Sequence, residues 1–533
     1  MILSKSRLSR LALGAIVGAG CVAGATAADW SSAGKDLKNS RYQADEMAIS
    51  PATAGALQLK WAIDTDGDVT ANPAVDGNYI YFPDSAGSLY KVHRITGALA
   101  WKKPISQYTG IAGDYARATP AVAGDLLILG NQAGKFLQFF GQPAPQPARV
   151  FAVNKHTGAA VWNTQVDSTA LSFVTNSAIV HGGMAYVGTA SNEELVAAFV
   201  PKAYWQWHFR GATVALDVAT GAIKWKTFTV PQGYYGGSIW SSTGAVDRAH
   251  GLLYMSSGNN TAVPQAVLDC MNAGGAPANC MSRDNHFDSI IAMDLATGAI
   301  RWGARGLPYD AWNVGCGLNV PGFFVPPNDN CPTPSGPDYD FAQGPMLFGG
   351  NGGDNEGGNL VGAGQKSGMF WAFNAKTGKP AWSRQVAPGG VTGGLQWGSS
   401  TDGRTIWAAA ANAGDTLSGG VPKVWTLMDG STTTAGGWAA MDAKKGDLLW
   451  TKADPLGGRS EAAVSSANGV IFGCSKAPPG TMYAMNAATG AVLWSYNSGG
   501  FCNAGASVAD GMVYWGSGTF QGTGVKKVFA FGL

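Results

Sequence analysis

The segment VALDVATGAIKW at residues 214–225 returns almost unchanged as IAMDLATGAIRW at residues 291–302. Each copy places an Asp-x-x-Thr-Gly stretch between two apolar runs, which is the pattern of a strand, a tight turn and a second strand. Glycine supplies a turn residue with positive φ at no steric cost, and the preceding Asp can bond back to the turn backbone. The Trp ends each copy as a large apolar wedge. The segment therefore predicts a repeated β-hairpin.

Further copies of this hairpin extend along the chain. Clear copies end at Trp162, Trp382 and Trp494, and looser copies end at Trp101 and Trp450. An eighth copy is split, because residues 57–61 read as the end of a unit and residues 528–531 as the start of one. Pairing the two termini in one sheet would close a ring and remove its exposed edges. We therefore predict an all-β fold, an eight-bladed β-propeller over residues 29–533, closed by its N- and C-terminal strands.

The composition agrees with a turn-dense β protein. The 533 residues include 76 Gly, about twice the usual share of roughly 7%. Charged residues make up 13%, against a typical share of about 25%, and 19 Trp are present. The formal net charge of +2 gives no electrostatic reason to expect a nucleic acid partner.

The N-terminus has the pattern of a secretory signal. Lys5, Arg7 and Arg10 precede an apolar run at residues 11–22, and the Ala-Thr-Ala at residues 25–27 fits a cleavage site. The apolar run is too short for a comfortable membrane span. We expect residues 1–28 to be a signal peptide, the mature protein to be periplasmic or secreted, and no stable membrane insertion.

Cysteine usage fits an oxidising compartment. Cys21 lies in the signal segment and leaves a lipid-anchored form as a weaker alternative. The other six cysteines are Cys270, Cys280, Cys316, Cys331, Cys474 and Cys502. An even number in an exported protein favours disulfides, and the simplest pairing joins sequence neighbours. Buried free thiols are the alternative. No CxxCH motif for covalent haem is present.

The repeat resembles the pyrroloquinoline quinone (PQQ) propeller repeat over nearly all of residues 29–533. Non-catalytic scaffold propellers share that repeat, so its Thr-Gly and Trp residues read as structural, and function depends on residues outside it. Residues 336–341, Asn259-Asn260 and the stretch from Leu493 to Gly518 are similar to the polyvinyl alcohol dehydrogenase branch of the PQQ-dependent (quinoprotein) alcohol dehydrogenase family. The adjacent cysteine pair common in mainstream members is not in this sequence.

The resemblance implies a hard cation, calcium or a lanthanide, held by oxygen ligands. Glu193-Glu194 follows one predicted strand, and Asn259 follows another. These residues are similar to the Glu and the Gly-Asn motif that hold calcium in the family. The spacing favours Glu193, and Glu194 is nearly as good. A solvated acidic turn and an ordinary Asn-rich turn are the alternatives.

The resemblance also implies a PQQ site. Trp240 resembles the family Trp that lies beneath the quinone, and Arg117 and Lys366 resemble the positively charged groups that hold its oxygens and carboxylates. Thr175 has the spacing of a family Thr that touches the cofactor, and Ser191 is a weaker candidate.

The catalytic base is the least regular part of the pattern. The first candidate motif, from Asp310 to Asn313, has Asn where the family has its base, and Asn cannot accept a proton. A later stretch, Pro-Asp-Tyr-Asp-Phe at residues 337–341, matches the rest of the family motif. We therefore expect Asp338 to be the base and a metal-site residue, and Asp340 to be a carboxylate either behind the base or on the metal side. A surface turn with two acids is the alternative.

These residues together predict a quinoprotein dehydrogenase that oxidises alcohol groups by hydride transfer to PQQ. The substrate is an alcohol, small or polymeric, and the electrons leave through a separate cytochrome c or another acceptor. A non-catalytic propeller that serves as a binding or assembly scaffold is the alternative.

Overall fold

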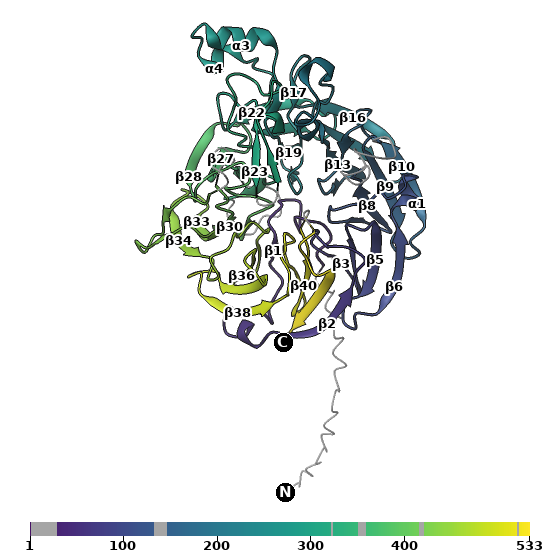
Figure 1. The fold of residues 1–533 in the computed structure, drawn as a ribbon. Helices are drawn as coiled ribbons and strands as arrows, with labels where there is room; N and C mark the ends of the chain where they lie inside the picture. The colour runs from purple at the N-terminus through teal and green to yellow at the C-terminus, as the bar shows by residue number, and fades with distance from the viewer. Residues whose placement is uncertain (2–28, 133–145, 321–322, 350–358, 415–420, 520–521) are drawn as a thin grey trace.

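The computed structural model describes all residues except 2–28, 133–145, 321–322, 350–358, 415–420 and 520–521. In the described residues, eight β-sheets of four or more strands are arranged as blades around a ring (Figure 1). The predicted eight-bladed propeller is confirmed. The predicted signal peptide falls almost wholly in residues 2–28 and so lies outside the described residues.

The blades follow chain order. Blades 1 to 4 contain β3 (Ala74–Asp76), β4 (Tyr79–Pro83), β5 (Ser88–His93) and β6 (Leu99–Pro104); β7 (Ala121–Ala123), β8 (Leu126–Gly130), β9 (Arg149–Asn154) and β10 (Ala160–Gln165); β12 (Ile179–His181), β13 (Met184–Gly188), β15 (Ala212–Asp217) and β16 (Ile223–Phe228); and β18 (Ala245–Asp247), β19 (Leu252–Ser256), β21 (Ser289–Asp294) and β22 (Ile300–Arg305).

Blades 5 to 7 contain β25 (Met346–Phe348), β26 (Leu360–Gly364), β27 (Met369–Asn374) and β28 (Pro380–Gln385); β29 (Ser400–Thr401), β30 (Thr405–Ala410), β33 (Gly437–Asp442) and β34 (Leu448–Ala453); and β35 (Ser465–Ala467), β36 (Val470–Ser475), β37 (Thr481–Asn486) and β38 (Val492–Asn497). Blade 8 contains β39 (Ser507–Ala509), β40 (Met512–Ser517), β41 (Lys527–Gly532) and, from the N-terminal part of the chain, β2 (Gln58–Asp64).

Shorter elements lie in the connections. They are the strand pairs β11 (Ser172–Phe173) with β14 (Ala190–Ser191), β17 (Tyr235–Gly236) with β20 (Asn260–Ala262), β23 (Leu318–Val320) with β24 (Phe323–Val325), and β31 (Trp425–Thr426) with β32 (Thr432–Thr433); the helices α1 (Ser106–Thr109), α2 (Glu193–Val196), α3 (Gln265–Asn272) and α4 (Pro277–Cys280); and the 3-10 turns η1 (Ala54–Ala56), η3 (Lys202–Tyr204) and η4 (Val314–Cys316). Figure 1 shows α3 and α4 projecting beyond the ring.

The ring closes in blade 8 as the split repeat predicts. Strand β2 pairs antiparallel with β41, and the register places Leu59 opposite Phe531 and Trp61 opposite Ala530. The outer strand of the last blade therefore comes from the beginning of the chain, which joins the two ends of the ring by backbone hydrogen bonds.

The repeat Trp links neighbouring blades, whereas the sequence suggested only that it ends its own unit. The indole Nε1 of Trp225 in blade 3 donates to the Leu295 carbonyl of blade 4 at 3.2 Å. Trp494 of blade 7 donates in the same way to the Leu57 carbonyl beside β2, at 2.8 Å. The Trp225 ring covers the turn glycine of the next blade, because a Cβ added to Gly298 would lie 2.5 Å from it. The Gly and Trp of the repeat thus meet across blade boundaries.

This contact predicts a difference between two turn glycines. Gly298 (φ +73) lies beneath Trp225, whereas Gly251 (φ +65) has open space at its Cβ position. Both Ala substitutions should lose about 1–2 kcal/mol because the backbone is left-handed. Gly298→Ala should lose a further 1–3 kcal/mol, roughly, from overpacking. Denaturant unfolding of the two variants measures this difference, and equal losses would show that the Trp contact is unimportant.

An inner segment, residues 30–43, follows the innermost strands around the ring. Backbone carbonyls of the segment accept hydrogen bonds of 2.7–2.9 Å from innermost-strand N–H groups, in the pairs Trp30–Val75, Ser31–Val122, Leu37–Val246, Lys38–Leu347, Ser40–Thr401 and Arg41–Ser466. Its end, β1 (Tyr42–Gln43), pairs parallel with β35. The segment therefore satisfies backbone groups on the inner edges of the blades, which would otherwise be unpaired.

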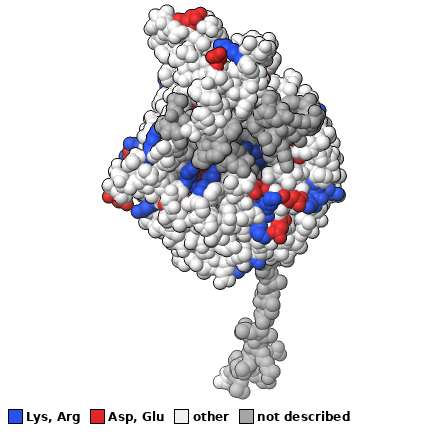
Figure 2. Space-filling model, viewed as in Figure 1, with Lys and Arg blue, Asp and Glu red and all other residues white. Residues whose placement is uncertain are grey.

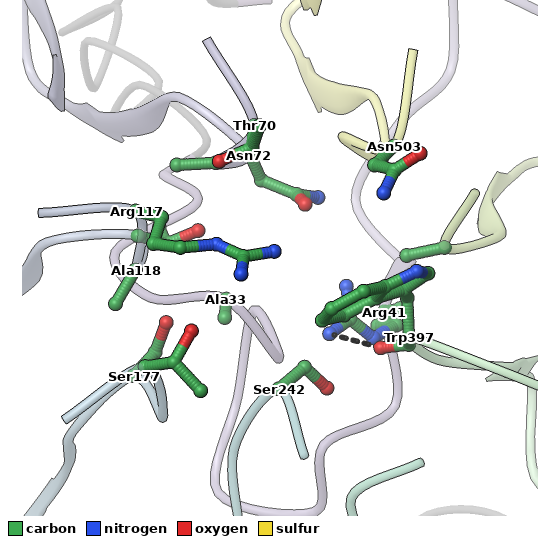
Figure 3. A pocket seen from close by; sticks show the side chains of 14 residues that line it. Ala33, Arg41, Thr70, Asn72, Arg117, Ala118, Ser177, Ser242, Trp397 and Asn503 are labelled. Carbon is green, nitrogen blue, oxygen red and sulfur yellow. Dashed lines mark hydrogen bonds between the residues drawn. The ribbon is translucent and has the colours of Figure 1, made fainter. Parts of the chain in front are cut away.

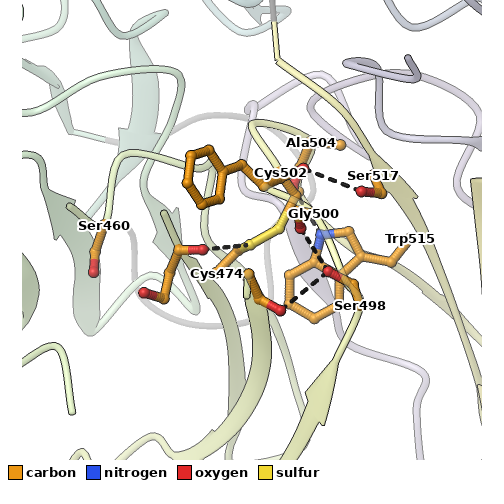
Figure 4. Close-up of a disulfide and its surroundings, with 12 residues drawn as sticks. Ser460, Cys474, Ser498, Gly500, Cys502, Ala504, Trp515 and Ser517 are labelled. Atoms are coloured by element: carbon orange, nitrogen blue, oxygen red, sulfur yellow. Dashed lines mark hydrogen bonds between the residues drawn. A yellow bond between two sulfur atoms is a disulfide. The ribbon is translucent and has the colours of Figure 1, made fainter. Parts of the chain in front are cut away.

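Three disulfides pair the cysteines as sequence neighbours: Cys270–Cys280, Cys316–Cys331 and Cys474–Cys502. The predicted pairing is confirmed. The Cys474–Cys502 bridge joins β36 of blade 7 to the connection that leads into blade 8, beside Trp515 (Figure 4). It therefore ties together two blades next to the closure of the ring.

The visible surface carries small mixed clusters of acidic and basic residues on a largely uncharged background (Figure 2). No helix in the described part of the chain is long and apolar enough to cross a membrane.

Candidate active site

A central cavity of about 260 Å³ lies among the connections that lead into and out of the blade strands. It brings together eight residues singled out from the sequence: Arg117, Thr175, Ser191, Glu194, Trp240, Asn259, Asp340 and Lys366. Asn259 follows β19, and Lys366 follows β26. Connections from different blades therefore supply a single site, as is usual for loops on a rigid scaffold.

A lysine bridges the two carboxylates of the 337–341 motif. Lys366 Nζ lies 2.9 Å from Asp338 Oδ1 and 2.7 Å from Asp340 Oδ2. Trp240 Nε1 also donates to Asp340 Oδ2, at 3.0 Å, and the Asn259 backbone N–H donates to Asp340 Oδ1 at 2.6 Å. Both oxygens of Asp340 therefore have hydrogen-bond or ion-pair partners.

Asp338 does not occupy the position expected from the sequence. Asp340, expected either behind the base or on the metal side, lines the cavity, whereas Asp338, expected as the base, is not among the lining residues and contacts one of them, Lys366. Within the described residues, the second carboxylate oxygen of Asp338 accepts no hydrogen bond. Burial raises the pKa of Asp338 well above its usual value, although the Lys366 charge acts in the opposite direction. Asp338 thus keeps one oxygen able to take a proton.

Asp310 and Asn313 have supporting contacts. The Asp310 carboxylate accepts from the backbone N–H groups of Asp338 at 3.2 Å and Tyr339 at 2.7 Å. These bonds hold Asp338 in a left-handed backbone conformation, with φ +60. The Asn313 amide donates to the carbonyls of Thr261 and Asn330. Neither side chain is among the residues that line the cavity.

The two adjacent glutamates face different surroundings. Glu194 lines the cavity, and burial, followed by the Asp340 charge, raises its pKa to about 7. Glu193 lies outside the lining, and its carboxylate accepts the backbone N–H groups of His208 and Phe209. The structure therefore favours Glu194 over Glu193 as a ligand to anything bound in the cavity.

The oxygen atoms of Glu194, Asn259 and Asp340 are donors of the type that calcium and lanthanides take. Asn259 donates its amide N–H to the Trp312 carbonyl at 2.8 Å, which orients its side chain. Among the described residues, no three His, Cys, Asp or Glu side chains converge as a preformed metal site. A cation here would need side chains to close around it and ligands from outside this set.

The aromatic part of the site has two tryptophans. The Trp240 and Trp397 rings meet edge to face, with centroids 5.5 Å apart and an interplanar angle of 75°. Lys366 Nζ lies 5.3 Å from the Trp240 ring centre, and Arg117 Cζ lies 5.3 Å from that of Trp397. A flat surface with two cations beside it fits a planar anionic ligand such as PQQ. The sequence did not indicate Trp397, because no recognisable motif surrounds it at residues 394–399.

The raised pKa of Glu194 predicts how the stability of the cofactor-free protein depends on pH. Glu194 is shifted from 4.5 to about 7, so the folded protein keeps a proton that the unfolded chain has lost. Its contribution to the free energy of unfolding therefore falls as pH rises from about 4.5 through about 7. Thermal unfolding across this range should show a shallower decline for Glu194→Gln than for the wild type. An unchanged slope would show that Glu194 does not titrate in this way.

The eight-bladed ring with a lysine-bridged carboxylate pair beside a tryptophan surface defines a β-propeller with a polar, charged central site. The PQQ_2 family model, described as "Outer membrane protein assembly factor BamB", matches residues 47–304 and 392–527. The chain belongs to this family of PQQ-type propellers, and its named relatives support an alcohol dehydrogenase of the PQQ-dependent kind.

Two polyvinylalcohol dehydrogenases are similar over most of the chain. The protein from Sphingopyxis sp. (strain 113P3) is 28% identical over 523 residues, which cover 92% of this chain and 72% of the relative. The protein from Pseudomonas sp is 27% identical, with coverage of 92% and 73%. The crystal structure of quinohemoprotein alcohol dehydrogenase from Comamonas testosteroni has a TM-score of 0.64 at 17% identity, and the match covers 95% of this chain and 80% of that one. That structural likeness supports the fold.

Proposed function

We propose that this protein is a periplasmic quinoprotein dehydrogenase that oxidises alcohol groups with PQQ and calcium. The observation that carries the proposal is the Asp338–Lys366–Asp340 cluster, which lies against Trp240 in one cavity. Buried, coupled ionisable groups gathered at a cavity are typical of a functional site and are not part of the propeller repeat, which supports an enzyme over a scaffold.

The residues divide into three roles. Trp240 would provide the flat surface for the quinone, and Arg117, Lys366, Thr175 and Ser191 would hold its polar edge. Glu194, Asn259 and Asp340 would hold the cation, with calcium expected and a lanthanide as the alternative. When bound, the quinone supplies the hydride acceptor and the cation supplies the positive charge that polarises it.

Asp338 would receive the proton of the substrate hydroxyl by way of Lys366, because Lys366 lines the cavity and Asp338 does not. The Lys366 ammonium would give one proton to the Asp338 carboxylate as it takes the proton of the hydroxyl. The raised pKa of Asp338 makes it a stronger proton acceptor than an exposed aspartate. Asp310 fixes the backbone of residues 338 and 339, so the base is held in place before substrate binds.

The substrate class is an alcohol, and the named relatives support a secondary or polymeric one. Because no CxxCH motif is present in the chain, we propose that the electrons pass to a separate cytochrome c or another soluble acceptor. Export to the periplasm fits the predicted signal peptide and the three disulfides.

Quinone binding tests this proposal through Trp240. Trp240→Leu removes the flat surface and the indole donor to Asp340. PQQ affinity should fall by about tenfold or more, since aromatic stacking and burial contribute about 1.5 kcal/mol or more. Calorimetric titration of the purified protein measures it, with Trp207→Leu, outside the cavity lining, as the matched control. Equal affinity in wild type and Trp240→Leu would rule out this placement of the quinone.

A further inference from the structure

A second, smaller cavity of about 40 Å³ lies inside the ring of innermost strands. Its walls come from residues just before those strands, including Asn72, Arg117, Ser242 and Asn503, and from Arg41 of the inner segment (Figure 3). No role in the proposed reaction involves Arg41, Asn72 or Asn503. The cavity is far too small for a three-ring quinone, so its occupant must be small.

Arg41 enters this cavity as a deeply buried cation. The residue is 1% exposed, and its Nη2 donates to the Trp397 carbonyl at 3.4 Å. Its Nε and Nη1 have no hydrogen-bond partner among the described residues. Burial lowers the pKa of Arg41 to about 10, so it remains charged at neutral pH. A buried charge without a counter-ion costs several kcal/mol, roughly.

The local backbone is arranged to admit this guanidinium. Arg41 itself has a left-handed backbone, with φ +50. Gly398 lies against its side chain, because a Cβ added there would be 2.4 Å from Arg41 Nε. Only glycine leaves room for the Arg41 side chain at that position. The left-handed backbone of Arg41 and the close approach of Gly398 both indicate that the fold holds the Arg41 side chain in this one position.

Amide donors surround the same space. The Asn72 Oδ1 accepts from the Gly505 backbone N–H at 3.0 Å, so the orientation of its amide is fixed. The Nδ2 atoms of Asn72 and Asn503 are buried without a partner among the described residues. Figure 3 shows both amides and the Arg117 guanidinium directed toward the middle of the cavity. No carboxylate is among the residues that line it.

We propose that this axial cavity binds one small monovalent inorganic anion of the chloride class. The anion would neutralise Arg41 and accept hydrogen bonds from the Asn72 and Asn503 amides, which a neutral water could not do with the same charge balance. Arg117, Thr175 and Trp397 line both cavities, so the anion would also support one wall of the proposed quinone site. The site itself does not require the quinone.

Bromide, a heavier halide, provides the direct test. Crystals of the purified protein grown with bromide in place of chloride should give one anomalous peak in hydrogen-bond contact with Arg41 Nε or Nη1 and with the two amides. Water alone in the cavity would overturn the proposal. A cofactor carboxylate seated there would also overturn it and would assign Arg41 to the quinone site instead.

Thermal unfolding in solution provides a second readout. At constant ionic strength, replacing gluconate by chloride should raise the Tm of the wild type in a saturable way, because an ion that binds only the folded state stabilises it. Arg41→Met should abolish this rise, and Asn503→Leu should reduce it if Arg41→Met does not fold. Arg94→Met is the matched control, since Arg94 is buried and paired with Asp510 outside the cavity. A wild-type Tm that is the same in both salts would contradict the proposal.

Discussion

Replacing Asp338 with asparagine is expected to lower kcat by about 100- to 10,000-fold, the usual contribution of a general base. Asparagine keeps the shape of the side chain and its contact with Lys366, but it cannot take the hydroxyl proton. Quinone affinity should change little, because Asp338 lies behind the cavity wall. Steady-state kinetics with a saturating alcohol and a titration with PQQ measure the two effects separately.

Two neighbouring acids serve as controls for this experiment. Asp310→Asn should cause a smaller loss and keep the pH profile of the wild type, since Asp310 acts only through the backbone of residues 338 and 339. Asp340→Asn should also weaken metal and quinone binding, because Asp340 contacts Trp240 and Asn259. If Asp338→Asn were nearly normal while Asp310→Asn or Asp340→Asn lost its pH-dependent step, the base would be one of those residues.

Lys366→Met should lower the stability of the cofactor-free protein by about 3–5 kcal/mol, the cost of removing one partner of a buried ion cluster. Burial alone would lower the pKa of Lys366, but the charges of Asp338 and Asp340 raise it above its usual value. Without the ammonium, the two carboxylates would face each other in a buried site. Unfolding in denaturant measures the loss.

Two controls test the interpretation of Lys366→Met: the pH dependence of the stability loss, and the same substitution at a lysine in a surface ion pair. Without Lys366, the carboxylates should take up protons in the folded state, so the loss should be smaller at acid pH than at pH 8. Lys102, which pairs with Asp66 at 2.9 Å on the surface, is the matched site, and Lys102→Met should cost less than about 1 kcal/mol. If Lys366→Met and Lys102→Met lost similar amounts of stability, the buried Asp338–Lys366–Asp340 cluster would contribute no more than a surface ion pair.

The sequence predicted the ring well because the repeat encodes it locally. A turn glycine with positive φ and a Trp at fixed spacing have few structural solutions, and the split repeat at residues 57–61 and 528–531 predicted the pairing of β2 with β41. The inner segment was missed because its contacts are backbone carbonyls, such as those of Ser31 and Leu37, which no side-chain pattern encodes.

The sequence indicated which residues gather in the cavity better than it indicated how they are placed there. Trp240, Asn259 and Lys366 lie on connections next to recognisable strands, and they meet in one cavity. The order of Asp338 and Asp340 could not be read from a motif, because it depends on the left-handed backbone at Asp338 that the distant Asp310 stabilises. The choice of Glu194 over Glu193 depends on the N–H groups of His208 and Phe209, which reach only the first glutamate.

Reconstitution of the purified protein tests the assignment as a quinoprotein alcohol dehydrogenase. Alcohol-dependent reduction of an artificial electron acceptor should be observed only when PQQ and calcium are both added, and a chelator should abolish it until calcium is restored. Turnover without PQQ, or PQQ bound with calcium present and no oxidation of any alcohol in a panel of small and polymeric substrates, would contradict the assignment as a quinoprotein alcohol dehydrogenase.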